Sequence, residues 1–400
     1  MWRGATLLVL AGVWAAAGFF LWETRVPSDL RLPDLDARDY FGLRHLARTD
    51  DYERFHRINF VLSTVALLAC LVYYAARGAK FARESAAGRI GTGMLLAMLG
   101  FALVWLVQLP FDVAGHWWDR RHGVAEFGYF ELIFGSWLAL GVEFLLLCLA
   151  VLIVMGLAGV LRRRWWIPGA AVFVGLATLF TFVSPYLVTD SHPLRNRKLA
   201  AAAKELARAQ GVGDVEVKVE DVDAYTSAAN AYATGLGPSR KVFLWNTLLD
   251  GRFGEREVRV VLAHELAHHS REHLWKSIAW YALFAVPGAY LIALATRRRG
   301  GMAEPAAVPL SLLVLVALNL AATPLQNVIS RHLEAEADWV ALETARDPQA
   351  AVRLFRRFST TSLGDPTPPG WAYVLLESHP SLLERIAMAE AWKARNPGNP

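Results

Sequence analysis

Two residue classes are scarce in this chain of 400 residues: there are only 2 cysteines, and charged residues make up 19%. Cys70 and Cys148 both lie inside apolar runs, which excludes a disulfide framework and a cysteine-based zinc site. Any metal would therefore need histidine and carboxylate ligands. Hydrophobic residues make up 55%, against roughly 45–50% in an average soluble protein. This excess excludes a disordered, collagen-like or coiled-coil chain and indicates long segments in lipid.

The formal net charge of +5 would suit a nucleic-acid partner, but the sequence contains no basic and aromatic motif typical of a nucleic-acid reader. Basic residues instead occupy short links between apolar runs, for example at 162–164 and 297–299. There they would meet lipid headgroups and bear on topology. We therefore expect the lipid bilayer, and no nucleic acid, among the partners.

Seven apolar runs are long enough to cross a hydrocarbon core of about 30 Å as helices. The first is longer than a signal-peptide core and lacks a clean cleavage site, so we expect it to stay as an uncleaved span. Five runs precede a polar interval and two follow it: 5–22, 58–76, 90–111, 132–161, 165–188, 274–296 and 306–328.

The polar interval changes from helical to strand periodicity and back. A helix is expected at 199–210, which is rich in alanine, lysine, glutamate and arginine, and Gly211 and Gly213 are expected to end it. Alternating valines at 215–219 and the segment K-V-F-L-W at 241–245 predict two short strands. From Arg256 to Lys276 the period is helical again. The interval therefore predicts an α+β unit with a small sheet.

His264, Glu265 and His268 form an H-E-x-x-H pattern on this last helix. Residues four apart share a helix face, so the two imidazoles can bind one Zn²⁺ while Glu265 lies beside the open coordination position. We expect such a pattern by chance in only about 1–2% of chains of this composition. The alternative is a buried helix whose histidines are hydrogen-bonded in the core.

A catalytic zinc needs three protein ligands and a water. Glu334 is the candidate third ligand, and Asp338, four residues later, could accept a hydrogen bond from a ligand histidine. Glu336 is expected on another face as a solvated or ion-paired residue. His269 is one position off the ligand face, and His273 is expected beyond the reach of a single ion. Neither is predicted to be a ligand.

The order of these motifs resembles the integral-membrane zinc metallopeptidases, which include the type I CAAX prenyl endopeptidases and the HtpX heat-shock proteases. Five spans before the polar interval fit the CAAX branch better than the shorter HtpX branch. The similarity rests on H-E-L-A-H at 264–268, R-x-x-E-x-x-A-D at 331–338, S-H-P at 378–380, N-A-Y-A-T-G at 230–235 and R-K-V-F-L-W-N-T-L-L at 240–249.

The resemblance implies one Zn²⁺ per chain, held by His264, His268 and Glu334. Glu265 would be the catalytic base, and Asp338 would support a ligand histidine. The implied reaction is hydrolysis of a peptide bond by a metal-activated water.

A peptide or protein substrate is also implied. Asn230, with Ala231 and Tyr232 after it, resembles the family segment that meets the substrate backbone. His379 resembles a catalytic residue near the bound peptide, placed to donate a hydrogen bond to the developing oxyanion. The strand at 241–245 would offer an edge to which an extended peptide adds as a further strand.

We therefore predict a mainly α, polytopic membrane helical bundle with a zincin-type α+β catalytic domain that carries a small β-sheet. The expected activity is that of a membrane-embedded zinc endopeptidase. Four segments are expected: an N-terminal membrane domain with five transmembrane helices (1–188), a catalytic insert with the H-E-x-x-H helix (189–273), two further transmembrane helices (274–328) and a C-terminal catalytic part with the third ligand (329–400).

Several alternatives stay open. The protein could be an HtpX-like quality-control protease rather than a CAAX-type processing enzyme, because Ala267 and His269 replace the glycine and aromatic residue common in CAAX members. A non-proteolytic polytopic protein would not need H-E-x-x-H with a matched third ligand. Arginine outnumbers lysine, which favours a bacterial cell membrane as the location. The basic links favour an outward-facing zinc domain, whereas the HtpX resemblance implies the opposite.

Overall fold

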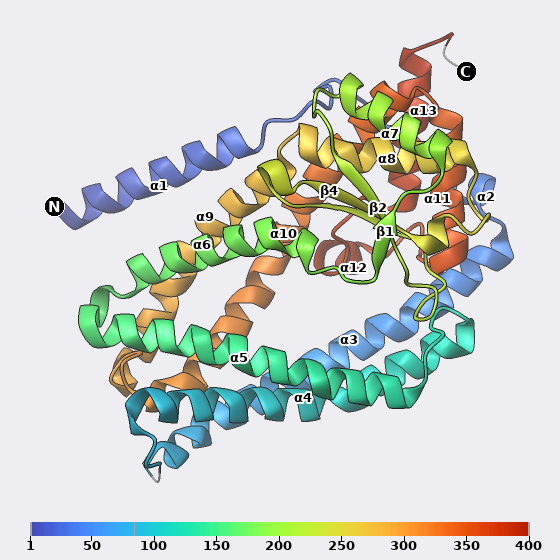
Figure 1. The fold of residues 1–400 in the computed structure, drawn as a ribbon. Helices are drawn as coiled ribbons and strands as arrows, with labels where there is room; N and C mark the ends of the chain where they lie inside the picture. The colour runs from blue at the N-terminus through green and yellow to red at the C-terminus, as the bar shows by residue number, and fades with distance from the viewer. Residues whose placement is uncertain (1, 84, 399–400) are drawn as a thin grey trace. The chain divides into compact units, whose positions relative to one another are not determined.

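The computed structural model describes residues 2–83 and 85–398 (Figure 1). Contacts divide the chain into two compact units, which we describe separately. Unit 1 comprises Met1–Glu53, Ala177–Trp280 and Pro324–Pro400, and unit 2 comprises Arg54–Leu176 and Tyr281–Thr323. Four long helices contribute residues to both units: α3 (Leu43–Arg77), α6 (Trp166–Val183), α9 (His273–Thr296) and α10 (Val308–Ala345).

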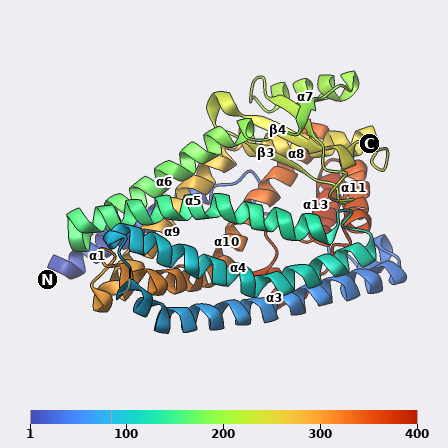
Figure 2. The same ribbon diagram turned by 60° about the horizontal axis from the view of Figure 1, so that its bottom comes forward.

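Unit 2 is helical, and its helices α4 (Gly88–His122) and α5 (Tyr129–Leu161) lie side by side (Figures 1 and 2). Gly93 allows their close approach, because a Cβ atom there would lie 2.2 Å from Met155 Sδ. Leu96 and Ala97 of α4 are buried in this contact together with Val151 and Met155 of α5. Short 3₁₀ segments connect the helices: η1 (Gly78–Arg83), η2 (Arg162–Arg164), η6 (Arg297–Arg299) and η7 (Pro305–Ala307).

Six helical segments of the described residues are long and apolar enough to cross a membrane. The first predicted span, 5–22, falls on α1 (Trp2–Leu21), of which the stretch Gly12–Leu21 counts as a shorter apolar helix. The prediction of a mainly α, polytopic bundle is confirmed, and six of the seven predicted spans fall on these helices. Residues 5–11 of the first predicted span lie outside the residues whose side chains the structure describes. The six helical segments are Leu43–Ala82, Gly88–His122, Tyr129–Arg164, Trp166–Tyr186, His273–Arg299 and Pro305–Ala345.

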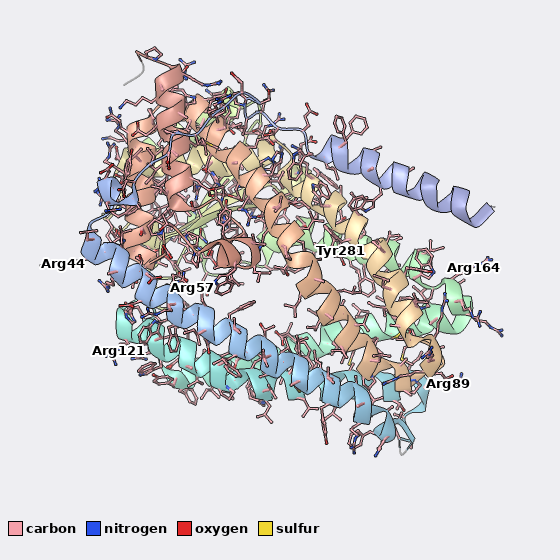
Figure 3. All side chains as sticks on the ribbon, turned by 180° about the vertical axis from the view of Figure 1, so that it is seen from behind. Arg44, Arg57, Arg89, Arg121, Arg164 and Tyr281 are labelled. Carbon is pink, nitrogen blue, oxygen red and sulfur yellow. The ribbon has the colours of Figure 1, made fainter. Side chains whose placement is uncertain are left out.

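Arginines mark the ends of the helices of unit 2 (Figure 3). Arg89 and Arg164 lie at one end, and Arg121 lies at the other. Arg89 Nη1 is also 3.5 Å from Glu304 Oε1, so the link between α9 and α10 lies at the same end as Arg89. This distribution places guanidinium groups where a bilayer would present its headgroups.

Unit 1 contains a four-stranded sheet in the order β1-β2-β4-β3. β2 and β4 are parallel, whereas β3 runs antiparallel to β4 and forms an edge. The interpretation of residues 241–245 as the peptide-binding edge is therefore wrong. The alanine-rich segment before them, which lacks a clear strand alternation, pairs along the outer side of β4. The strands are β1 (Ser191–Pro193), β2 (Glu216–Glu220), β3 (Ala231–Thr234) and β4 (Lys241–Trp245).

Helix α8 (Glu255–Ser270) lies at the centre of the hydrophobic core of unit 1. Leu262 and Leu266 are fully buried, and the helix packs against the sheet and against α7 and α11. Contact on several sides holds this helix in a fixed position. The remaining helical segments are α2 (Ala37–Tyr40), α7 (Arg197–Ala209), α11 (Pro348–Ser362), α12 (Gly370–Leu375), α13 (Leu382–Arg395), η3 (Ser184–Tyr186), η4 (Gly237–Ser239) and η5 (Asn246–Leu248).

Both ends of α8 are defined by local interactions. At its start, the Gly254 N–H donates to Glu257 Oε2 at 2.9 Å, which caps the first turn. At its end, Glu272 adopts a left-handed conformation with φ 55°, and α9 begins at His273. The helical period predicted from Arg256 to Lys276 is therefore carried by two helices, which a turn without glycine separates.

Candidate active site

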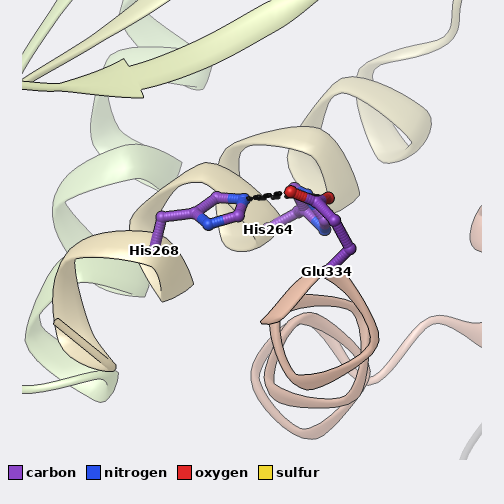
Figure 4. Close-up of side chains that lie close together, drawn as sticks. All are labelled: His264, His268 and Glu334. Carbon is purple, nitrogen blue, oxygen red and sulfur yellow. Dashed lines mark hydrogen bonds and ion pairs between the residues drawn. The ribbon is translucent and has the colours of Figure 1, made fainter. Parts of the chain in front are cut away.

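Three side chains converge at one point of unit 1 (Figure 4). His264 and His268 come from α8, and Glu334 comes from α10, which continues without a break past the predicted span. His264 Nε2 lies 3.2 Å from both His268 Nε2 and Glu334 Oε2. His268 Nε2 lies 3.6 Å from Glu334 Oε1. The structure thus brings together the three residues proposed from the sequence as metal ligands.

This spacing fits a metal ion. Ligand atoms at about 2.0–2.2 Å from a tetrahedral ion lie roughly 3.3–3.6 Å from one another, close to the observed 3.2–3.6 Å. Glu334 Oε2 is buried and receives no well-aligned hydrogen bond from the described part of the chain. A buried carboxylate oxygen without a donor is costly unless a cation is bound beside it. His264, His268 and Glu334 can therefore hold a metal ion.

The electrostatics of the two histidines differ. Burial lowers the pKa of His264, but the carboxylates of Asp338 and Glu334 raise it by more, to about 10. These carboxylates favour a positive charge at this point, which a proton or a metal ion supplies. Burial lowers the pKa of His268 to about 3, so its imidazole is neutral at pH 7, the form that binds metals.

Asp338 and Arg385 support His264 on the Nδ1 side of its ring, away from the metal site. Asp338 Oδ1 accepts a hydrogen bond from His264 Nδ1 at 2.9 Å. Nδ1 then carries the proton, and Nε2 presents its lone pair to the site. Arg385 donates to both oxygens of Asp338 and lies 4.4 Å from the Phe355 ring centre. No role for Arg385 could be predicted from the sequence, because nothing in its local pattern indicates contact with Asp338.

Glu265 follows the first ligand on α8 and is buried. Burial raises the pKa of its carboxyl group to about 7, although the nearby His264 and Arg385 charges and the Ala233 backbone oppose the shift. A carboxyl group with this pKa exists in both protonation states near neutral pH. It can therefore accept a proton and return it.

The segment proposed to meet the substrate lies along β3. Asn230 directly precedes this strand, and its side-chain Oδ1 accepts the Ala231 N–H at 2.9 Å. Tyr232 stacks on Phe243 and donates its hydroxyl to Glu220 at 3.0 Å. Ala231 packs against the core, so alternation places the Tyr232 side chain on the other face of the sheet. Because Asn230 O accepts from Trp245 N, the ladder uses the Tyr232 backbone to pair with Phe243, and the backbones of Ala231 and Ala233 are left at the outer edge.

His379 lies beside the ligand group. Its Nε2 is 3.4 Å from Glu334 Oε2, and 56% of its side chain is exposed. Ser378 Oγ lies 3.1 Å from His379 Nδ1. A hydroxyl that donates to Nδ1 keeps the imidazole proton on Nε2, the nitrogen nearer the metal ligands.

His269 joins α8 to the sheet. Its Nε2 lies 3.1 Å from the Lys241 carbonyl oxygen, to which it donates. Burial lowers its pKa to about 4, so the ring is neutral at pH 7. This contact points away from the ligand group and agrees with the expectation that His269 is not a ligand.

Glu336 differs in part from expectation, and His273 makes a contact that the sequence did not predict. Glu336 is fully buried, so the solvated alternative is wrong. The ion-paired alternative is correct, since Arg271 and Lys276 lie 2.7 and 3.1 Å from its carboxylate oxygens. His273 is also buried and lies next to His268, with 3.0 Å between their Nδ1 atoms. The turn at Glu272 brings it there, which a continuous helix would not do.

Comparison with known proteins identifies the family. Residues 193–393, about half of the chain, match the model of Peptidase family M48. This chain belongs to peptidase family M48. The matched region includes the three candidate ligands, Glu265 and His379. With the apolar helices described above, the chain is a membrane metalloprotease, and its substrates are peptides or proteins.

The relatives agree with this assignment. An uncharacterised metalloprotease, YhfN of Bacillus subtilis, is 28% identical over 299 residues, covering 71% of this chain and 70% of the relative. An HtpX protease homologue of Methylibium petroleiphilum is 32% identical over 162 residues, 40% of this chain and 55% of its own length. A CAAX prenyl protease 1 homologue of Oryza sativa subsp. japonica is 23% identical over 310 residues, 74% and 73% of the two chains.

The fold has a solved counterpart. The crystal structure of S. mikatae Ste24p superposes with a TM-score of 0.76 and covers 95% of this chain and 96% of its own, at 18% identity. At this identity the match shows a shared fold. The predicted resemblance to membrane metallopeptidases of the CAAX protease and HtpX type is confirmed.

Proposed function

We propose that this protein hydrolyses internal peptide bonds with one Zn²⁺ held by His264, His268 and Glu334. The observation that carries the proposal is the 3.2–3.6 Å spacing of the three ligand atoms, directly beside Glu265. Two imidazoles and one carboxylate are a ligand set that suits zinc. When bound, Zn²⁺ supplies a Lewis acid that acidifies a water molecule and polarises the scissile carbonyl.

Glu265 is proposed as the general base. Its carboxylate accepts the proton of the attacking water and then delivers that proton to the departing amine. A pKa of about 7 suits both transfers at neutral pH, because the group is neither too weak a base nor too weak an acid.

His379 is proposed as a donor to the oxygen that gains negative charge. Its Nε2 lies near Glu334, and the Ser378 hydroxyl beside Nδ1 favours the tautomer with the proton on Nε2. A donor aimed at the developing oxyanion stabilises the transition state more than the substrate.

Substrate is proposed to bind to β3 by strand addition. The outer edge of this strand has no partner among the described strands, so its backbone groups can pair with an extended peptide. The Ala233 backbone is near enough to Glu265 to lower the pKa of its carboxyl group, which brings this edge next to the base. Asn230, at the start of the strand, is placed to set the register of the peptide.

We further propose the domain organisation expected from the sequence. Residues 189–273 and 329–400 form the catalytic domain, and residues 1–188 and 274–328 form the membrane segments. A bacterial cell membrane is the proposed location, supported by the high arginine content and the bacterial relatives. Clearance of peptides or damaged proteins is favoured over prenyl-protein processing, because Ala267 and His269 depart from the CAAX pattern.

The test uses the full chain purified in detergent. We expect one zinc per chain by mass spectrometry and cleavage of casein. Glu265→Gln should retain zinc and lose hydrolysis by about 10²–10⁴-fold. Glu272→Gln, an exposed acid seven residues later, is the matched control and should keep the parent rate. A zinc-loaded Glu265→Gln protein with parent activity would exclude the proposed mechanism. Sequencing of peptides trapped by Glu265→Gln would define the substrate class.

A further inference from the structure

The ligand His268 has a buried partner of its own. We propose that His273 and Glu336 form a positioning pair that orients the His268 imidazole for metal binding. This inference rests on the proposed function, because it assumes that His268 is a ligand. Neither residue is expected to touch the substrate or the metal ion.

The contacts form one continuous chain. His268 Nδ1 lies 3.0 Å from His273 Nδ1, and His273 Nε2 lies 3.0 Å from Glu336 Oε2. His268 Nε2, on the other side of the ring, faces His264 and Glu334. His273 therefore connects Nδ1 of the ligand His268 to the buried Glu336 carboxylate.

With His273 neutral, one arrangement of protons satisfies every contact. Glu336, as a carboxylate, only accepts, so the proton of His273 must be on Nε2. His273 Nδ1 then has a free lone pair and accepts from His268 Nδ1–H. With its proton on Nδ1, His268 presents the Nε2 lone pair to the metal site. The pair therefore selects the metal-binding tautomer and also fixes the plane of the ring.

Glu336 is itself held firmly. Oε1 accepts from the Arg25 backbone N–H at 2.9 Å and from Arg271 Nε at 2.7 Å. Oε2 accepts from His273 and from Lys276 Nζ at 3.1 Å. Four donors from two stretches of the chain, Arg25 and residues 271–276, thus saturate a fully buried carboxylate. The position of this carboxylate, and hence of the His273 ring, is determined by both stretches together.

The segment that follows α1 also contacts residues around Glu336. Lys276 Nζ also donates to the Glu23 carbonyl at 3.1 Å, and His332 stacks on Trp22 with 4.0 Å between the ring centres. Glu336 is fully buried among these contacts, so little water is present to compete for the hydrogen bond between His273 and Glu336.

The two ligand histidines are then supported in parallel ways. His264 Nδ1 meets the carboxylate of Asp338 directly, whereas His268 Nδ1 reaches Glu336 through His273. A buried ion pair that served stability alone would need only the Arg271 and Lys276 contacts. The imidazole inserted between carboxylate and ligand indicates a function toward the metal.

The experiment measures zinc affinity of the full chain in detergent, by competition with a chromophoric chelator after removal of metal. Loss of a partner behind a metal ligand typically weakens metal binding 10–100-fold, and we expect this range for His273→Ala. The control is His269→Gln, a change at another buried histidine that bonds to Lys241 and not to a ligand. It should alter zinc affinity less than about twofold.

Two conservative variants separate the contact of His273 with His268 from its contact with Glu336. Asparagine places an amide oxygen near the position of imidazole Nδ1, whereas glutamine places an amide nitrogen near that of Nε2. His273→Asn should therefore keep the contact with His268 and bind zinc more tightly than His273→Gln. The absorption spectrum of Co²⁺-loaded protein should shift in His273→Ala and return toward the parent in His273→Asn. Thermal unfolding of the metal-free proteins shows whether each variant is folded.

The results separate failure of the positioning role from failure of the proposed function. Folded His273→Ala protein with the zinc affinity and Co²⁺ spectrum of the parent would overturn the positioning role. If that parent also bound zinc and cleaved casein, the proposed function would stand without this inference. A parent that bound no zinc would overturn both.

Discussion

Arg385 donates hydrogen bonds from Nε and Nη2 to the two oxygens of Asp338, at 2.8 and 2.7 Å. Asp338 in turn accepts from His264 Nδ1 at 2.9 Å. Both members of the ion pair are largely buried, with side-chain exposures of 11% and 5%. The ligand histidine therefore depends on a charge pair that comes from two separate helices, α10 and α13.

Removal of Arg385 is predicted to destabilise the protein. Arg385→Met leaves the Asp338 carboxylate buried without its partner, and we expect a loss of about 3–5 kcal/mol. Arg385→Lys keeps the charge but not the two parallel hydrogen bonds, so the protein should fold and bind zinc more weakly. Thermal unfolding and zinc content check both variants. A Met variant as stable as the parent would show that Asp338 does not need the guanidinium.

The activity is predicted to rise with pH because Glu265 must be deprotonated to act as a base. Burial raises its pKa from 4.5 to about 7, and a bound cation would lower it again. The acidic limb of kcat/KM is therefore expected between pH 4.5 and 7. Below its pKa the rate should fall tenfold per pH unit. A flat profile down to pH 4.5 would argue against this base.

The ligand group could be predicted from the sequence because its spacing is local. His264 and His268 share a face of one helix, as do Glu334 and Asp338, and the 3.6-residue period alone establishes this. The long apolar runs predicted the membrane helices, because length and composition are enough to identify a span.

Contacts between distant segments could not be predicted in this way. Arg385 reaches Asp338 only in the folded chain, and the interior position of β4 depends on its parallel pairing with the more distant β2. The turn at Glu272 is local but carries no glycine or asparagine signal. For this reason the helical period did not predict that His273 lies next to His268.

His269 is predicted to make stability depend on pH. Burial lowers its folded-state pKa from 6.5 to about 4, so folding favours the neutral ring. The stabilisation is present above pH 6.5 and is lost as the pH falls toward 4. At pH 5 the loss is roughly 2 kcal/mol relative to pH 7.5. His269→Gln, which does not titrate, should lose less stability than the parent between these pH values. An equal loss in both proteins, measured by thermal unfolding, would exclude His269 as the cause.

Strand addition to β3 is predicted to involve only a short stretch of substrate. The strand has four residues, Ala231–Thr234, and at about 3.3 Å per residue it spans roughly 13 Å. A peptide from casein that the protein cleaves can be N-methylated at one backbone nitrogen at a time. Each methyl group that removes a hydrogen bond to β3 should lower kcat/KM about tenfold, equivalent to a loss of about 1.4 kcal/mol. Methyl groups farther than about four residues from the scissile bond should have little effect, and they serve as the control. If methylation near the scissile bond changes kcat/KM no more than methylation at the distant positions, the substrate does not pair with β3.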